Sequence, residues 1–417
     1  MIKILQVRNV DIFVESRRQK TSDKDRKIVQ SILDDVRKNG DTAVKKYEQK
    51  FNGRRTTSLR VSEKEIKEAK ITKPQFDALR LSALRLSNAQ KSLKKSLVDS
   101  VSKLPNISFI PISSVGCYVP GGQARYSSSA IMSVITAAEA GVKRIVVTSP
   151  PGSDGKIDPM TITVAQKCGA EVYKVGGAQA IGALAFGTKS IPKVDKIVGP
   201  GGKFVSIAKA IVSEQTSIDM IAGPTELGIL ADATTDPELV ALDLISQAEH
   251  SNDTMCFVIT TSKTMAKQIQ KSLEKLIPYI ERKMIVQQSI SKNGFIAICK
   301  NQKEMVDLAN KIAPEHMELM VKNAKTLSKS ITGPGLVLIG NNTPSSASDY
   351  LLGTNHILPT SGFGRTRGGL SVLDFLKLQT VVETKKSELS RVSDNLKTLT
   401  DAEGLPNHYK AVERRLK

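Results

Sequence analysis

Residues 171–186 read EVYKVGGAQAIGALAF, and this stretch decides the fold. Its first five residues are typical of a strand, the two glycines of a tight turn, and the remaining apolar residues of a buried helix. A strand, a glycine turn and a helix in this order form the repeating unit of a parallel α/β sheet. We therefore predict an α/β fold with parallel strands.

The same order of elements recurs on both sides of this stretch. Predicted strands at 144–148 and 196–198 are each followed by a turn rich in glycine or proline. After residue 226 the order repeats, with predicted strands near 227, 256, 295 and 335. No strand is predicted beyond about residue 370, where helices at 387–402 and 409–416 follow.

These repeats predict two similar Rossmann-like doubly wound domains with small N-terminal and helical C-terminal appendages. The predicted boundaries are an N-terminal segment at 1–13, a first α/β domain of 14–117 with 227–370, a second α/β domain at 118–226, and a helical tail at 371–417.

Composition excludes several classes of protein. No window approaches the roughly 18 apolar residues of a membrane-spanning helix. The N-terminus lacks a signal peptide, and the four cysteines are scattered without a Cys-x-x-Cys pair. These features predict a cytoplasmic protein without a disulfide framework.

The net charge of +20 raises the question of nucleic-acid binding. The lysines are spread over the polar faces of amphipathic helices, and aromatic residues make up 4% with no tryptophan. Platforms for stacking bases are therefore scarce. We expect neither nucleic-acid nor membrane binding.

The chain has only four histidines, and each lies near carboxylate or amide side chains. Histidine is the side chain that titrates nearest neutrality and a common neutral ligand of zinc. Such sparing use predicts that these residues serve chemistry. The four are His250, His316, His356 and His408.

Gln247 and His250 are three residues apart near the end of a predicted helix, so both should lie on one face. Asp349 and His408 complete a candidate set of two oxygen and two nitrogen ligands. Because this set lacks a thiolate, it favours a metal site with room for substrate over a structural zinc site. Taken alone, the pair also fits an ordinary polar helix face.

Glu315 and His316 follow Pro314, which stops the preceding predicted helix. An adjacent acid and imidazole supply two proton acceptors within one loop. One acceptor would deprotonate an alcohol and the other a water molecule. An exposed pair without function remains the alternative at this point.

Glycine-rich turns at 116–122, 176–177 and 199–202 each follow a predicted strand and precede a helix. Backbone N–H groups at such turns bind phosphates. None of the turns matches Gly-x-Gly-x-x-Gly, and 362–368 has the wrong spacing. A dinucleotide ligand is therefore left open by motif alone.

Taken together, several segments resemble the histidinol dehydrogenase family. The resemblance covers about residues 110–410. Its motifs, in chain order, are YVPGG at 118–122, GAQAI at 177–181, VDKIVGPG at 194–201, DMIAGPTE at 219–226, SQAEH at 246–250, APEH at 313–316, GTNHILPT at 353–360 and AEGLPNH at 402–408.

The resemblance implies a zinc-dependent, NAD-linked enzyme that oxidises L-histidinol to L-histidine in two hydride transfers through an aldehyde. It implies His316 as general base and Glu315 as the residue that activates water. The implied zinc ligands are Gln247, His250, Asp349 and His408.

It further implies a substrate site lined by Thr225, Glu403, His316 and the four zinc ligands, and NAD contacts from Tyr118, Gln179 and Gly202. It also implies a homodimer in which the C-terminal tails are exchanged. The first α/β domain would carry the zinc and catalytic residues, and the second would contact NAD.

Two positions depart from the family pattern. Gly202 lies where asparagine is common, which puts one NAD contact in doubt, and Thr225 replaces a common serine. A zinc-dependent hydrolase is the alternative enzyme, and a basic nucleic-acid or phosphate-binding module is the alternative without catalysis. The hydrolase would act without NAD, and the binding module would tolerate loss of His316.

Overall fold

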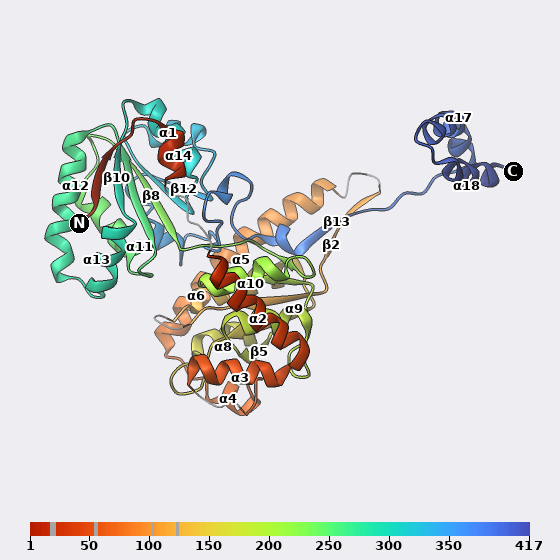
Figure 1. Ribbon diagram of the computed structural model, residues 1–417, viewed down its shortest axis with the longest axis horizontal. Helices are drawn as coiled ribbons and strands as arrows, with labels where there is room; N and C mark the ends of the chain where they lie inside the picture. Colours follow the sequence, from red (N-terminus) through yellow and green to blue (C-terminus); the bar gives the residue numbers. More distant parts are fainter. Residues whose placement is uncertain (17–21, 54–56, 102–103, 105, 122–124) are drawn as a thin grey trace. The chain divides into compact units, whose positions relative to one another are not determined.

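The computed structural model describes residues 1–16, 22–53, 57–101, 104, 106–121 and 125–417. The chain forms two compact units (Figure 1). Unit 1 comprises Met1–Lys95 and Pro111–Leu376, and unit 2 comprises Ser96–Ile110 and Lys377–Lys417. Each unit is described by itself. Gly122, the last residue of the glycine turn at 116–122, lies outside the described residues.

A six-stranded parallel sheet forms one half of unit 1, in the order β1-β10-β9-β8-β11-β12. In the register, His316 pairs with Leu227 on one side and Leu336 on the other. The amino ends of the three strands β8, β11 and β12 therefore meet. The strands are β1 (Lys3–Gln6), β8 (Glu226–Ala231), β9 (Met255–Thr260), β10 (Phe295–Ile298), β11 (His316–Met320) and β12 (Leu336–Ile339).

Helices cover both faces of this sheet (Figure 1). Side chains that alternate along β8 enter opposite cores: Leu227 and Ile229 on one face, Leu230 on the other. One face packs against α11 (Pro237–Ala248), α12 (Lys263–Leu276) and α13 (Lys283–Lys292), and the other against α1 (Val10–Glu15), α14 (Gln302–Ile312) and α15 (Ala324–Leu327).

A five-stranded parallel sheet forms the other half of unit 1, in the order β5-β4-β3-β6-β7. Its strands are β3 (Ser114–Tyr118), β4 (Arg144–Ser149), β5 (Glu171–Lys174), β6 (Lys196–Val198) and β7 (Ser217–Ile218). Two parallel sheets covered by helices confirm the predicted α/β class.

The five-stranded sheet is likewise covered on both faces. One face carries α4 (Glu63–Glu68), α5 (Lys73–Val101), α6 (Ser127–Ala130), η1 (Ile131–Ile135), α7 (Thr136–Ala140) and α8 (Pro159–Lys167). The other carries α2 (Asp23–Asn39), α3 (Asp41–Asn52), α9 (Gly177–Phe186) and α10 (Lys203–Val212).

The local sequence explains several helix boundaries. Asp236 accepts a hydrogen bond from the Glu238 N–H at the start of α11, and Pro237 occupies the first turn. Gly40 ends α2 with a positive φ of 51°. Such a left-handed conformation favours glycine.

The segment α6–η1–α7 is one continuous helix whose middle five residues form a π-helix. The Met132 carbonyl accepts hydrogen bonds from Thr136 Oγ1 at 2.6 Å and from Asn355 Nδ2 at 2.9 Å. In this widened turn, the side chains of Thr136 and Asn355 therefore supply hydrogen bonds to the Met132 carbonyl.

Unit 2 contains α17 (Lys386–Ala402) and α18 (Pro406–Leu416), which pack on each other. The prediction that no strand follows residue 370 is wrong. The segment LKLQT forms β13 (Leu376–Thr380), which pairs with β2 (Ile107–Pro111) in a two-stranded sheet. The short, mostly polar segment becomes a strand only through this distant partner.

The remaining short elements are α16 (Ser345–Ser348), η2 (Ile277–Tyr279), η3 (Ser328–Ser330), η4 (Phe363–Arg365) and η5 (Val372–Phe375). Among the described residues, none of the helices is both long enough and apolar enough to cross a membrane.

Candidate active site

A cavity of about 420 Å³ lies in unit 1 and collects most of the predicted site residues. Its walls include residues 200–203 after β6 and 222–225 before β8. The predicted residues that line it are Gly202, Thr225, Gln247, His250, Glu315, His316 and Asp349. A larger cavity of about 890 Å³ shares the wall at 222–224 but is lined by none of the predicted site residues.

The two sheets present opposite ends to the cavity. The turn at 200–203 follows the carboxyl end of β6, as expected for ligand sites in parallel sheets. Glu315 and His316, by contrast, lie at the amino end of β11, beside the amino end of β8. The rule that places ligands at carboxyl ends therefore describes only one wall.

Glu315 is buried, and its carboxylate is held from the neighbouring strand. Its Oε2 atom accepts hydrogen bonds from Thr225 Oγ1 and, at 3.1 Å, from the Glu226 N–H. Burial raises the pKa of Glu315, and these donors together with His316 offset only part of that shift. The side chain is thus a stronger base than an exposed glutamate.

His316 is 2% exposed and lies between two carboxylates. Its Nε2 is 3.2 Å from Asp349 Oδ1, and its Nδ1 is 3.9 Å from Glu315 Oε2. Burial lowers the pKa of His316, but the two carboxylates outweigh burial and raise it to about 9. The ring therefore holds a proton more tightly than a free imidazole does.

His316 and Asp349 form an ion pair that is not a regular hydrogen bond. Both ring nitrogens of His316 and Oδ1 of Asp349 are buried and make no hydrogen bond to any described residue. Buried polar atoms without partners are rare in folded proteins. Their presence together marks this part of the cavity as a place for a ligand.

His316 corrects one detail of the sequence prediction. We expected Glu315 and His316 within one loop, but His316 is the first residue of β11. Ala313, with a left-handed φ of 49°, ends α14 and turns the chain through Pro314 into the strand. The imidazole is therefore held by a sheet, more rigidly than a loop would hold it.

Gln247 and His250 line the cavity from the end of α11. Gln247 Nε2 donates to Thr225 Oγ1 at 2.6 Å, and Thr225 in turn donates to Glu315, which makes a chain of three side chains. The prediction that both residues share a helix face is only partly right, because α11 ends at Ala248 and His250 lies beyond it. Burial lowers the pKa of His250 and favours its neutral form.

His356, which the sequence predicts to serve chemistry without a specific role, also lines the cavity. Its Nδ1 lies 2.8 Å from the Asp349 carbonyl oxygen, so Nδ1 carries the proton. Its Nε2, 3.2 Å from Ser129 Oγ, then accepts the hydroxyl hydrogen. The ring thus fixes the backbone at Asp349. Its signals in the sequence are its place among the four histidines and its position in GTNHILPT.

Tyr118 and Gln179, the other predicted NAD contacts, do not line this cavity. The Tyr118 hydroxyl accepts a hydrogen bond from the Gly177 N–H at 3.1 Å. Gln179 Nε2 donates to Glu48 Oε1 at 2.8 Å, and that atom also accepts the Gly176 N–H at 2.9 Å. Tyr118 thus binds the glycine turn that begins α9 directly, and Gln179 supports it through Glu48.

Glu403 and His408 belong to unit 2, where both are exposed. Glu403 directly follows α17, and His408 lies in the first turn of α18. Unit 1 therefore supplies three of the four predicted zinc ligands, Gln247, His250 and Asp349. Within the described ranges, no three His, Cys, Asp or Glu side chains gather closely enough to hold a metal.

Comparisons with known proteins show the family of this chain. The family model described as histidinol dehydrogenase matches residues 15–416. A histidinol dehydrogenase from Oceanobacillus iheyensis is 40% identical over 407 residues, covering 95% of this chain and 94% of the relative. One from Methanococcus maripaludis is 42% identical over 396 residues, covering 93% and 92%.

The crystal structure of histidinol dehydrogenase from Elizabethkingia anophelis superposes with a TM-score of 0.90 at 32% identity, covering 100% of this chain and 98% of that one. The chain belongs to the histidinol dehydrogenase family, oxidoreductases of histidine biosynthesis that act on an alcohol and then on the aldehyde.

Proposed function

We propose that this chain oxidises L-histidinol to L-histidine through the aldehyde, with NAD as the hydride acceptor, in the 420 Å³ cavity. The observation that carries the proposal is the buried group of Glu315, His316 and Asp349, whose polar atoms are only partly satisfied. Family membership supplies the substrate, and these residues supply the chemistry.

His316 is the general base of the first oxidation. The alcohol must lose its hydroxyl proton as hydride leaves the carbon. The carboxylates of Asp349 and Glu315 flank the ring, at 3.2 and 3.9 Å. They stabilise the imidazolium that forms when the ring accepts this proton.

Glu315 activates water for the second oxidation, because only the conversion of aldehyde to acid consumes water. Thr225 and the Glu226 N–H hold one carboxylate oxygen. Burial makes the carboxylate more basic, which favours removal of a proton from water.

A zinc ion would be held by Gln247, His250 and Asp349 of one chain and by the partner's His408. The donors fit zinc: one neutral imidazole, one amide and a buried carboxylate oxygen without a hydrogen-bond partner among the described residues line one cavity. When bound, the ion would anchor the substrate's imidazole and amino nitrogen. The proton transfers remain with His316 and Glu315.

NAD would approach from the glycine turn at 199–202, with Tyr118 and Gln179 shaping the neighbouring turn. Gly202 is the N-cap of α10 without a side-chain cap, so backbone N–H groups face this wall. A Cβ at Gly202 would meet no atom within 4 Å. The asparagine common in the family would therefore fit, and its absence leaves recognition to the backbone.

The tail of unit 2 supports a homodimer in which His408 and Glu403 serve the partner's cavity. Helices α17 and α18 bury only Ser393, while Leu399, Val392 and Leu405 remain exposed. Two helices with so little buried surface gain by packing on another chain. We also assign the two sheets to two Rossmann-like domains. The predicted boundaries need correction, because residues 23–118 belong with the five-stranded sheet of 118–226, and β1 belongs with the six-stranded sheet of 227–370.

NADH absorbance on addition of histidinol tests the function, with and without a chelator. NADH formation that the chelator abolishes supports the proposal. Chelator-sensitive activity without NADH would instead point to a hydrolase. His250→Ala should lose bound zinc, measured by metal analysis, and keep its circular dichroism spectrum. Full zinc occupancy would contradict the ligand set.

Subunit complementation tests the exchanged tails. His316→Ala and His408→Ala chains, each inactive alone, are denatured and refolded together. If tails are exchanged, one site of each mixed dimer carries both defects and the other carries neither, so activity returns. Mixed dimers, identified by distinct tags, that stay inactive would show that His408 serves its own chain.

A further inference from the structure

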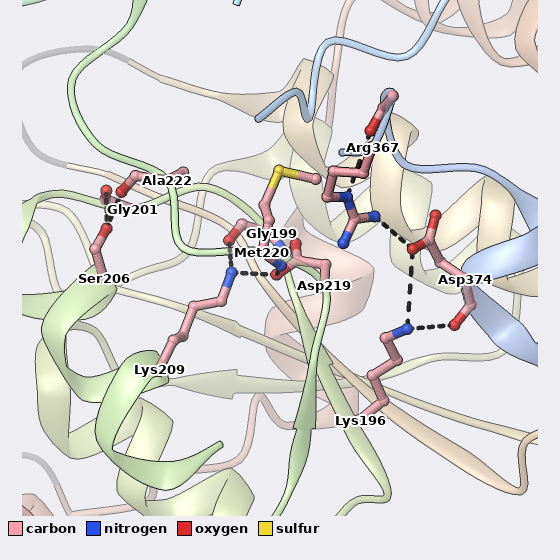
Figure 2. Close-up of polar contacts among 11 residues, drawn as sticks. Lys196, Gly199, Gly201, Ser206, Lys209, Asp219, Met220, Ala222, Arg367 and Asp374 are labelled. Atoms are coloured by element: carbon pink, nitrogen blue, oxygen red, sulfur yellow. Dashed lines mark hydrogen bonds and ion pairs between the residues drawn. The ribbon is translucent and has the colours of Figure 1, made fainter. Parts of the chain in front are cut away.

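A lysine and an aspartate are buried together behind the wall of the cavity (Figure 2). Lys209 lies on α10 and Asp219 directly follows β7, and their side chains are 2% and 0% exposed. They form an ion pair with each other. Neither residue lines the cavity, so neither can touch a bound substrate.

Both residues also bind the backbone of Gly199. Lys209 Nζ donates to the Gly199 carbonyl at 2.8 Å, and the Gly199 N–H donates to Asp219 Oδ2 at 2.8 Å. Gly199 has a φ of 115°, and a Cβ there would lie 2.1 Å from the Tyr118 carbonyl oxygen. The ion pair thus holds a conformation that only glycine can adopt.

Two walls of the cavity begin at this point. From Gly199 the chain continues into residues 200–203, all of which line the cavity. From Asp219 it continues to residues 222–225, which also line the cavity and end at Thr225, the donor to Glu315. The ion pair therefore fixes the position at which each segment begins.

A second contact from the same helix joins the same walls. Ser206, one turn before Lys209 on α10, places its hydroxyl against the Ala222 carbonyl and 3.3 Å from the Gly201 carbonyl. Segments 199–203 and 219–225 are thus tied together twice, by two polar residues on one face of α10.

Stability alone does not account for a buried ion pair. Removing two charges from water is costly, and well-packed apolar residues of similar volume often give equal or greater stability. What apolar residues cannot do is bind the N–H and carbonyl of Gly199. The arrangement therefore points to geometry at the cavity walls as the role of the pair.

We propose that Lys209 and Asp219 are positioning residues of the reaction: their ion pair holds the glycine turn at 199–203 and the segment 219–225 at the separation that catalysis requires. This inference rests on the proposed function, because it takes the cavity to be the active site. It adds two residues that act through the backbone and never through contact with substrate.

The test compares two matched double variants. Lys209→Met with Asp219→Ala removes the ion pair without leaving an uncompensated charge. Lys196→Met with Asp374→Ala makes the same changes at a second lysine–aspartate contact in Figure 2, where Lys196 Nζ donates to the Asp374 carbonyl at 2.6 Å. Lys196 and Asp374 do not line the cavity.

We expect kcat/KM for histidinol to fall about 100-fold in the first variant, because displacement of reacting groups by about 1 Å has effects of this size. We expect less than a threefold change in the second. Histidinol binding, followed by calorimetry, should weaken about tenfold only in the first. Circular dichroism at the assay temperature checks that both are folded. Equal activity and binding in the two variants would overturn the proposal.

Two further variants keep the outcome decisive. If the first double variant does not fold, Ser206→Ala tests the same tie and should lower kcat/KM about fivefold; an unchanged value would overturn the proposal. His316→Ala is measured in parallel. Full activity of His316→Ala would mean that the cavity is not the active site. An inactive His316→Ala beside a fully active Lys209/Asp219 variant would reject only the positioning role.

Discussion

Two buried polar groups in unit 1 differ in how completely their atoms are paired. Around Lys209, Asp219 and Gly199, the charged side chains and the glycine backbone are bound to one another. Around His316 and Asp349, two ring nitrogens and a carboxylate oxygen are buried and find no hydrogen bond among the described residues.

The fully paired group supports the cavity from behind, and the incompletely paired group belongs to the candidate active site. An unpaired buried polar atom costs roughly 1–3 kcal/mol of stability, and folded proteins avoid it except where function requires it. We therefore expect substitutions in the paired group to lower stability strongly. Substitutions in the unpaired group should lower activity more and stability less.

The sharpest test of the unpaired group is His316→Ala. We expect oxidation of histidinol to slow by about 10³-fold, because a general base contributes 10²–10⁴-fold. The melting temperature should fall by less than in Lys209→Met, because the carboxylates that lose the ring are 10% and 11% exposed, whereas Asp219 is fully buried. Steady-state kinetics and calorimetric unfolding measure the two effects. A loss of stability equal to that of Lys209→Met would contradict the comparison.

Lys209→Met alone tests the paired group. It leaves the Asp219 carboxylate buried without its cation, which costs about 3–5 kcal/mol. Lys196→Met is the control and should cost less, since Lys196 is 14% exposed beside a partly exposed Asp374. Urea unfolding gives both free energies. Equal values would mean that the degree of pairing does not set stability here.

Glu315→Gln tests whether the two oxidations depend on different residues of the unpaired group. We expect about a 10²-fold loss in oxidation of the aldehyde and a smaller loss in oxidation of the alcohol, because only the former consumes water. Histidinol and the aldehyde are supplied separately, and NADH formation is followed for each. Equal losses in both oxidations would show that Glu315 does not act mainly in the second.

Glu226 gives a smaller effect that depends on pH. Burial raises the pKa of its carboxyl to about 8, and one of its oxygens makes no hydrogen bond within the described part of the chain. Because this pKa lies above the unfolded value near 4.5, the folded chain holds the proton more tightly. That contribution to stability is complete below about pH 4.5 and is lost as pH rises towards 8.

Glu226→Gln resembles the protonated form and should not lose this contribution. We therefore expect the variant to gain about 3 °C in melting temperature relative to the wild type between pH 5 and 8, and no more above pH 8. Melting curves in a pH series check the trend. Parallel curves for the two proteins would show that Glu226 does not titrate in this range.

Much of the fold follows from local sequence. The apolar run at 144–149 forms the predicted strand β4, and the two glycines at 176–177 open α9 at the predicted place. These elements are specified by periodicity and by glycine, which act over a few residues. Strand β13 was missed, because its pairing with β2 is not a local property.

Site residues could be predicted from the sequence where the residue type itself indicates chemistry. They could not be predicted where their role depends on contacts between distant parts of the chain. Histidines and their neighbouring carboxylates led to His250, His316 and Asp349, which the structure brings into one cavity. Lys209 looks in the sequence like one more surface lysine of an amphipathic helix. Only the packing of α10 against the segment after β7 shows that it is buried beside Asp219.

The π-helix at Ile131–Ile135 makes the length of its helix as important as its composition. Deleting one residue there would restore ordinary α-helical winding, in which each carbonyl accepts the N–H four residues further on. The Met132 carbonyl would then bind the backbone in place of Asn355, the neighbour of His356, whose ring binds the backbone of Asp349. A shortened chain would thereby lose a contact that holds the cavity wall without any change at a candidate site residue.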